Sequence, residues 1–220
     1  MNMKKLIIAA AALVTLTATV SAQDLPSPFS FGVKGGLNIA GLSNLDNGQD
    51  RESLNIKLRT AFYVGAFAEY KFNDSFGISP EFVYSSQGTK AEGNEWDYEY
   101  KLPLHYFNIP VLAKVYVTEA FSIDFGPQFG LLLSAKDNEK TTWADGIEEY
   151  ETDFKGEGLI KTFDVGLGVG ATYNIGKFMI QCRYNIGLVD VAKFEGENEK
   201  PSDHKAWRNN VFQLGVAFRF

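Results

Sequence analysis

Nine charged side chains occupy every-second-residue positions within otherwise apolar segments: Lys34, Glu69, Lys71, Glu81, Lys114, Asp124, Asp164, Arg183 and Arg219. Four are acidic and five are basic, so their charges nearly balance. A charge that is buried in a narrow interior is costly unless it is paired and hydrogen-bonded. The residues with the strongest case for a cross-linked polar network that fills an interior and fixes strand register are Lys34, Glu69, Glu81, Lys114, Asp124, Asp164 and Arg183. The functional alternative is a gated or leaky ion path.

Catalytic chemistry has little support in the sequence. His105 and His204 are the only histidines, and no zinc-protease motif, serine nucleophile elbow or metal-spaced Cys/His cluster is present. The glycines of 166–170 superficially match a dinucleotide-binding loop, but they fall at every second position within a strand pattern and open no helix. We therefore predict no enzyme activity, no cofactor and no metal site.

The segment 136–158 is rich in carboxylates: Asp137, Glu139, Asp145, Glu148, Glu149, Glu151 and Asp153. Such a run is usually a solvated face. It could also hold Ca²⁺ together with lipopolysaccharide or a partner, although no EF-hand spacing occurs. Trp96, Trp143 and Trp207 lie in or beside polar segments, where interfacial or loop-packing roles are expected.

The elements that must position these residues are strands, because apolar residues recur with a period of two in eight segments. These segments are 29–39, 62–72, 76–85, 106–117, 121–133, 162–173, 178–188 and 211–220. In the last, Phe212, Leu214, Val216, Phe218 and Phe220 share one face. One face of each strand is almost free of charge, and the other carries the charged residues together with many glycines.

Short and long connections alternate along the chain. Turns of hairpin length are predicted at 73–75, near 118–119 and at 174–177. The other four connections are long and polar, at 41–59, 88–102, 136–158 and 190–206. Short periplasmic turns and long extracellular loops are typical of outer-membrane barrels. An even strand number places both termini on the periplasmic side and lets the last strand pair with the first.

The direction of the apolar face decides between a membrane barrel and a soluble one. The interior of an eight-stranded barrel is only just wide enough for side chains, so eight rows of Phe, Tyr, Leu and Val would not fit inside it. The sequence therefore predicts an all-β, eight-stranded, antiparallel up-and-down barrel in the bacterial outer membrane, with apolar residues toward lipid. The inward glycines would leave room for larger neighbours.

The N-terminus supports export. Residues 1–22 resemble a signal peptide, with Lys4 and Lys5, an apolar stretch to Val20 and small residues at the cleavage site. The predicted mature barrel is then 23–220; an uncleaved anchor is the alternative. The net charge of -6 disfavours nucleic acid as a partner. Cys182 is the only cysteine, which excludes an intramolecular disulfide. The C-terminal Phe220 resembles the signal by which the barrel-assembly machinery recognises such chains.

Several segments together resemble the PorT-like outer-membrane barrel family of Bacteroidetes. They are Gly32–Asn38 (GVKGGLN), Pro80–Gly88 (PEFVYSSQG), Tyr106–Lys114 (YFNIPVLAK), Gly126–Gly130 (GPQFG), Phe163–Gly168 (FDVGLG) and Arg183–Leu188 (RYNIGL). The resemblance covers nearly the whole mature chain. It implies an eight-stranded outer-membrane barrel and, since the name-giving member takes part in type IX secretion, a role in surface-protein secretion.

Three classes of function follow. The first is a monomeric structural or interaction barrel that contacts lipid and lipopolysaccharide, and whose acidic loops or periplasmic turns meet a surface or periplasmic protein. The second is a narrow channel for ions or small solutes. The third is an enzyme at the rim. A filled lumen conducts poorly, which favours the first class over the second.

Overall fold

The computed structural model describes residues 28–220 apart from 44–53, 94–96, 144–145, 151 and 194–205. The predicted signal peptide 1–22, its cleavage site, Trp96 and His204 lie outside the described residues. Among the residues that are described, no helix is long and apolar enough to cross a membrane.

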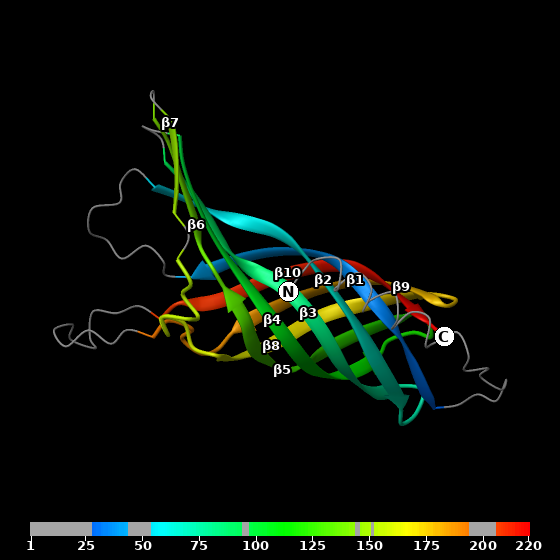
Figure 1. Ribbon diagram of the computed structural model, residues 1–220. Helices are drawn as coiled ribbons and strands as arrows, with labels where there is room; N and C mark the ends of the chain where they lie inside the picture. Colours follow the sequence, from blue (N-terminus) through cyan, green and yellow to red (C-terminus); the bar gives the residue numbers. More distant parts are fainter. Residues whose placement is uncertain (1–27, 44–53, 94–96, 144–145, 151, 194–205) are drawn as a thin grey trace.

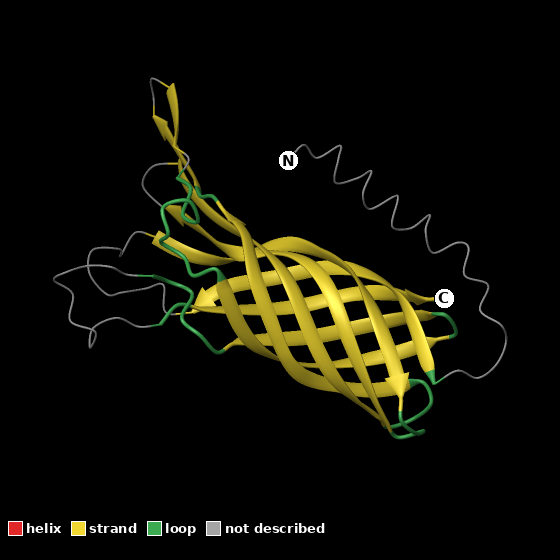
Figure 2. Cartoon of the chain, turned by 60° about the horizontal axis from the view of Figure 1, so that its bottom comes forward, coloured by secondary structure: helices red, strands yellow, loops and turns green. Residues whose placement is uncertain are grey.

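The described chain forms ten antiparallel strands (Figure 1). They are β1 (Phe29–Ser43), β2 (Leu54–Lys71), β3 (Phe76–Gly93), β4 (Asp97–Tyr116), β5 (Phe121–Ala135), β6 (Asn138–Trp143), β7 (Gly146–Tyr150), β8 (Phe163–Ile175), β9 (Phe178–Gly187) and β10 (Arg208–Arg219). Eight of them pair in the order β3-β2-β1-β10-β9-β8-β5-β4, and pairing of β3 with β4 closes the ring (Figure 2). This confirms the predicted eight-stranded antiparallel barrel.

Two of the predicted long loops are wrong in part, because the strands continue through them. β3 runs to Gly93 and β4 starts at Asp97, so most of the predicted loop 88–102 is a paired ladder that extends to Glu92 and Glu99. The predicted loop 41–59 likewise loses its ends to β1 and β2. The outward row of apolar residues marks only the lipid-facing portion of a strand, and main-chain pairing continues beyond it. In β4 the alternation itself continues, but Leu102 and Leu104 are on the buried face.

The predicted loop 136–158 contains a hairpin instead of only irregular chain. β6 pairs with the outer part of β4, and β7 pairs with β6, so β7 is the last strand of this extension among the described residues. β6 and β7 project well beyond the barrel with the outer parts of β2, β3 and β4 (Figure 1). The long connections therefore include a sheet that rises from one end of the barrel.

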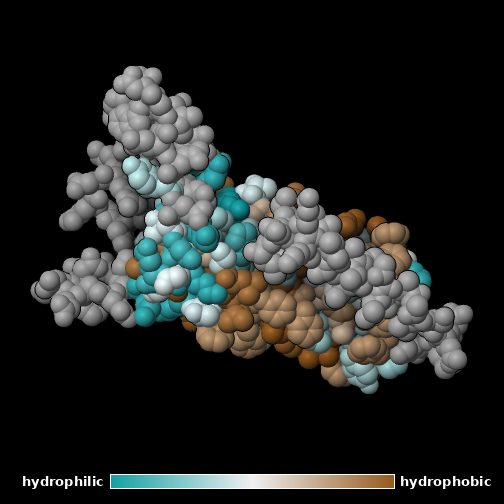
Figure 3. All heavy atoms as spheres, viewed as in Figure 1, coloured by the Kyte–Doolittle hydropathy of each residue, from teal (hydrophilic) through white to brown (hydrophobic). Residues whose placement is uncertain are grey.

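The two faces of the strands follow the predicted alternation. Along β9, exposed and buried residues alternate without a break from Phe178 to Gly187. Large apolar side chains cover the outer wall, among them Phe62, Phe82, Phe125, Phe129, Val169, Ile180, Leu214 and Val216. Figure 3 shows one side of this wall as a hydrophobic zone. The buried face holds the charged and amide side chains.

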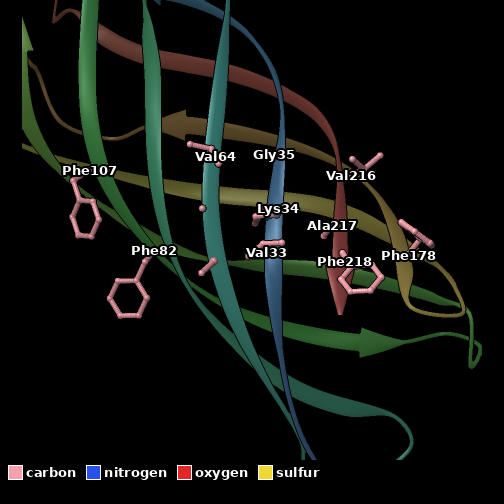
Figure 4. A pocket seen from close by; sticks show the side chains of 12 residues that line it. Val33, Lys34, Gly35, Val64, Phe82, Phe107, Phe178, Val216, Ala217 and Phe218 are labelled. Atoms are coloured by element: carbon pink, nitrogen blue, oxygen red, sulfur yellow. The ribbon is translucent and has the colours of Figure 1, made fainter. Parts of the chain in front are cut away.

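A shallow apolar hollow of about 490 Å³ lies on this outer wall. Small residues of β1, β2 and β10, such as Val33, Val64 and Val216, form its floor, with Phe82 and Phe107 on one side and Phe178 and Phe218 on the other (Figure 4). In a bilayer this hollow faces hydrocarbon.

β1 and β10 close the barrel over a continuous register from Gly32 opposite Arg219 to Ser43 opposite Arg208. At the end of this seam, the Phe220 amide donates to the Phe31 carbonyl over 3.0 Å. The Phe220 ring packs 5.5 Å from that of Phe31 and 5.7 Å from that of Phe218. The last residue thus extends the closing strand pair at the end that carries the short turns (Figure 2).

Two different structural constraints explain why glycine occupies lumen-facing positions. At Gly168, a Cβ would lie 2.9 Å from Asn185 Oδ1 and 3.4 Å from Arg183 Cδ, so this glycine leaves room for large neighbours. At Gly36, a Cβ would instead lie 2.2 Å from the Leu214 carbonyl oxygen, which belongs to the adjacent strand. The wall of this narrow barrel brings neighbouring backbones too close for a side chain there.

Candidate functional site in the barrel lumen

The centre of the lumen contains an ion triad around Glu81. The Arg183 guanidinium donates from two nitrogens to the two Glu81 oxygens, each over 2.8 Å, and the Lys34 ammonium donates to the same carboxylate over 3.0 Å. The three residues come from β9, β3 and β1, so the triad crosses the lumen. All three are at least 95% buried. The planar fork of Arg183 matches the carboxylate, which makes this the geometrically strongest pair in the lumen.

A second ionic group lies around Glu69 and Lys114. The Lys114 ammonium donates to Glu69 over 2.8 Å and lies 3.9 Å from Asp124. Arg219 donates to the other Glu69 oxygen over 3.2 Å. Asp124 accepts from the hydroxyls of Ser122, over 2.8 Å, and Thr172, over 2.5 Å. Two carboxylates and two cations therefore balance within this group.

Lys71, which the sequence also placed on the lumen face, contacts an aromatic ring. Its ammonium lies 4.3 Å from the centroid of the Tyr116 ring, within the range of a cation–π interaction.

A directional chain of amides connects four strands farther along the lumen. Asn185 donates to Gln213 over 2.9 Å, Gln213 donates to Asn38 over 2.9 Å, and Asn38 donates to the Ser86 carbonyl over 2.7 Å. Sequence reasoning focused on charges and did not assign these residues a role. The signal was nevertheless present, since Asn38, Asn185 and Gln213 alternate in phase with the charged residues of their own strands.

Asp164 is the predicted lumen residue that the structure places apart from the two ionic groups. It forms no ion pair within the described part of the chain. Asn209 lies between Asp164 and Gln87: its amide nitrogen is 3.5 Å from Asp164 Oδ2 and also donates to Gln87. Asp164 is 9% exposed, so this is a buried carboxylate among neutral amides.

An apolar cluster lies beyond the polar lumen at the end opposite the short turns. It consists of Leu42, Leu102, Leu104, Tyr106, Leu132, Ala135, Ile160 and Val191, with Tyr100, Phe154 and Trp207 packed against it. The connections contribute to it directly, because Ile160 and Ala192 form a bridge and Lys161 donates its amide to the Val191 carbonyl over 2.8 Å. We call this cluster the apolar plug. Its strand residues share the inward phase of Tyr106.

His105 and the glycines of 166–170 are the other sequence candidates that the structure describes. His105 lies 2.9 Å from the Tyr84 hydroxyl and stacks on its ring, on the outer side of the strands. No group of three or more His, Cys, Asp or Glu that could hold a metal occurs among the described residues. Gly166–Gly170 lie inside β8 and open no helix, as expected for a strand.

Two carboxylates of the acidic segment maintain local chain structure. Asp137 is buried and accepts the Thr152 amide over 2.6 Å, and Asp153 accepts the Gly156 amide over 2.9 Å. The expectation of a fully solvated acidic face is therefore wrong for Asp137. The side chains of Glu139, Asp145, Glu148, Glu149 and Glu151, together with that of Trp143, lie outside the described residues.

A closed barrel with an apolar outer wall and a polar, charge-paired interior defines a transmembrane β-barrel. The family model described as the outer membrane protein β-barrel domain matches residues 21–193. The chain belongs to this family and is a small protein of the bacterial outer membrane.

Solved structures of outer-membrane proteins are similar in fold. Ail of Yersinia pestis, crystallised with the heparin analogue sucrose octasulfate, is 14% identical over 87% of this chain and 99% of its own, with a TM-score of 0.44. OprG of Pseudomonas aeruginosa is 13% identical over 87% and 95%, with a TM-score of 0.40. Neisserial surface protein A is 12% identical over 88% and 98%, with a TM-score of 0.39. No curated protein matches the chain significantly.

Proposed function

We propose that this protein is a structural or interaction barrel with a side-chain-filled lumen, and that it acts through its extracellular connections or periplasmic turns. The observation that carries the proposal is the filling of the lumen. The Lys34–Glu81–Arg183 triad crosses its centre, and the apolar plug packs at the end opposite the short turns. Both features support a closed interior. An interior of this kind leaves function to the exposed ends.

The projecting sheet is the surface best suited to a partner. Among the described residues, β7 pairs on one side only, with β6, so its other edge presents main-chain groups that no described strand pairs. Such an edge can accept an extended segment of another protein by strand addition. Acidic residues of the same segment would favour a partner with basic groups, or a divalent cation shared with lipopolysaccharide. We propose that the barrel itself is a monomer.

The motif resemblance to PorT-like barrels of Bacteroidetes supports a more specific role in surface-protein secretion. That role depends on the order and spacing of segments such as Pro80–Gly88 and Tyr106–Lys114. The proposal includes no catalytic step and no cofactor. The second candidate is a narrow ion channel, which the charge-lined lumen would favour if the apolar plug opened.

Crosslinking in intact cells tests the interaction role. A photoreactive residue placed along β7, followed by purification of the crosslinked product, should capture one reproducible partner. A matched probe at Phe125, on the lipid-facing wall, should not capture it. Equal capture at both positions would contradict the proposal. Deletion of the gene should reduce secretion of surface proteins, and an unchanged secretome would remove the PorT-like role.

A further inference from the structure

A row of three lysines crosses the outer parts of β2, β3 and β4. Lys57 lies opposite Lys90, and Lys90 lies opposite Lys101, so the three occupy one register line across the sheet. By the two-residue repeat of a strand, Lys90 shares the outward face of β3 with Tyr84, and Lys101 shares that of β4 with His105. Each lysine also makes another contact within the chain. Like charges directly opposite each other destabilise a sheet, so an anion that binds along this row stabilises it.

Arg59 of β2 adds a fourth cation between the lysine row and the apolar wall. Its Nη1 donates to the Ser86 hydroxyl over 3.1 Å and to the Gln87 carbonyl over 2.8 Å. Ser86 lies opposite His105 in the ladder of β3 and β4, so the guanidinium is held next to the outward face of these strands. Arg59 is half-buried and forms no ion pair within the described part of the chain. A guanidinium in such a position is suited to bind a phosphate or carboxylate.

Tyr84 and His105 mark the boundary between the apolar wall and this cationic surface. The Tyr84 hydroxyl lies 2.9 Å from His105 Nδ1 and the two rings stack, while the Tyr84 ring also packs 6.0 Å from that of Phe62 on the wall. A tyrosine with an apolar neighbour on one side and a polar one on the other is typical of a membrane–water interface. Figure 3 shows hydrophilic side chains gathered beyond the hydrophobic zone, toward the long connections. The cations therefore begin where the lipid-facing wall ends.

The described carboxylates of these three strands, Glu69 and Glu81, are buried in the lumen, on the other face of the sheet. The cationic surface is also tall. Lys101 lies four residues farther along β4 than His105, which is about 14 Å along a strand. For a strand tilted by about 40°, this corresponds to about 10 Å farther from the membrane. The surface thus matches a ligand that carries several anionic groups at different heights.

We propose that the outer ends of β2, β3 and β4 bind the phosphorylated headgroup of lipopolysaccharide. Arg59 and His105 contact the phosphates nearest to the acyl chains, and the lysine row contacts anionic groups farther out on the sugars. The planar fork of arginine fits phosphate oxygens, and His105 retains Nε2 as a donor because Tyr84 occupies Nδ1. The acyl chains pack against the apolar wall below.

Two features favour lipopolysaccharide over a glycerophospholipid. The long connections of an outer-membrane barrel face the extracellular side, where lipopolysaccharide forms the outer leaflet. A phospholipid with one phosphate would engage Arg59 without reaching the lysine row. The surface is distinct from the edge of β7, so lipopolysaccharide should bind here whether or not a protein partner pairs with β7.

Titration of the purified, folded protein in detergent with fluorescently labelled rough lipopolysaccharide tests the surface. Arg59→Gln should weaken binding about 10-fold or more, as expected for the loss of a hydrogen bond to a charged group. Lys101→Gln should weaken binding by a smaller factor, and this effect should vanish at high salt because the side chain is exposed. The matched control Lys177→Gln, in an exposed turn at the opposite end, should bind like the wild type. Wild-type affinity in R59Q would overturn the proposal.

The wild-type protein provides a second measurement that does not depend on the folding of a variant. Rough lipopolysaccharide from which the phosphates have been removed should bind at least about 10-fold more weakly than the intact lipid. Phosphatidylglycerol, added as a competitor, should displace the labelled lipid only weakly. Equal affinity for the dephosphorylated lipid would overturn recognition of the phosphates. Equally strong competition by phosphatidylglycerol would overturn the assignment to lipopolysaccharide.

Discussion

The central triad predicts an unequal response to removal of its members, because it carries one carboxylate and two cations. Glu81→Gln leaves Lys34 and Arg183 buried, close together and without a counter-charge. Lys34→Met leaves the neutral pair of Arg183 and Glu81, which retains both 2.8 Å bonds. The two substitutions therefore differ in the net charge that they leave on the triad: plus two against zero.

These charges set the expected magnitudes. Removal of one partner from a buried ion pair costs about 3–5 kcal/mol, and E81Q should reach the upper part of that range because two cations remain. K34M should lower the free energy of unfolding by only about 0–1 kcal/mol. The variant loses the attraction between the ammonium and Glu81, but it also no longer has to bury a charged ammonium. The double variant E81Q/K34M should be about 1–2 kcal/mol more stable than E81Q, because it relieves the repulsion between the two cations.

Urea unfolding in detergent or lipid vesicles measures these differences. The folded fraction can be read from the electrophoretic mobility of unheated samples. Glu119→Gln, in an exposed turn, serves as the control and should leave the unfolding midpoint unchanged. If E81Q were as stable as the wild type, or if K34M cost as much as E81Q, the charge accounting for this lumen would be refuted.

Three further predictions concern the wall, the surface and the closing seam. Gly36→Ala should destabilise the barrel by about 1–3 kcal/mol, because its Cβ would lie 2.2 Å from the backbone of the adjacent strand. The neighbouring Gly35→Ala should be nearly neutral. Equal unfolding midpoints for the G36A and G35A variants would contradict this. Cys182 faces lipid from the middle of β9, so a charged maleimide should label it only after the protein unfolds. Mass spectrometry of the protein in nanodiscs measures the labelling. Rapid labelling of the folded protein would contradict the lipid-facing position of Cys182. Deletion of Phe220 should lower the amount of assembled protein in the outer membrane, as quantified by immunoblot, and wild-type levels would argue against its proposed role as an assembly signal.

The sequence was sufficient for the barrel because one constraint acts on every membrane-spanning strand. Lipid on one side and a packed lumen on the other force an alternation that remains visible from Phe178 to Gly187 without any partner strand. The same logic fails where a strand leaves the membrane. The outer parts of β3 and β4 and the hairpin β6–β7 are paired through main-chain groups and carry no outward apolar row. In the outer part of β4 apolar residues do alternate, but in the opposite phase, with Leu102 and Leu104 buried.

The sequence predicted which residues face the lumen but not which of them form ion pairs with one another. The phase of each strand places Lys34, Glu81 and Arg183 inside, but their mutual contact depends on how the strands are staggered around the ring. The isolation of Asp164 among amides has the same origin. The apolar plug needed a further step, because Ile160 and Val191 come from connections whose return into the mouth of the barrel leaves no periodic signal.

The central claim is that the lumen of this barrel is closed, and planar-bilayer conductance of the purified, folded protein tests it most directly. With the triad across the centre and the apolar plug above it, we predict a flat current trace at physiological salt and moderate voltage. Reproducible, ion-selective steps of uniform size from the wild-type protein would contradict the account and would support the channel instead.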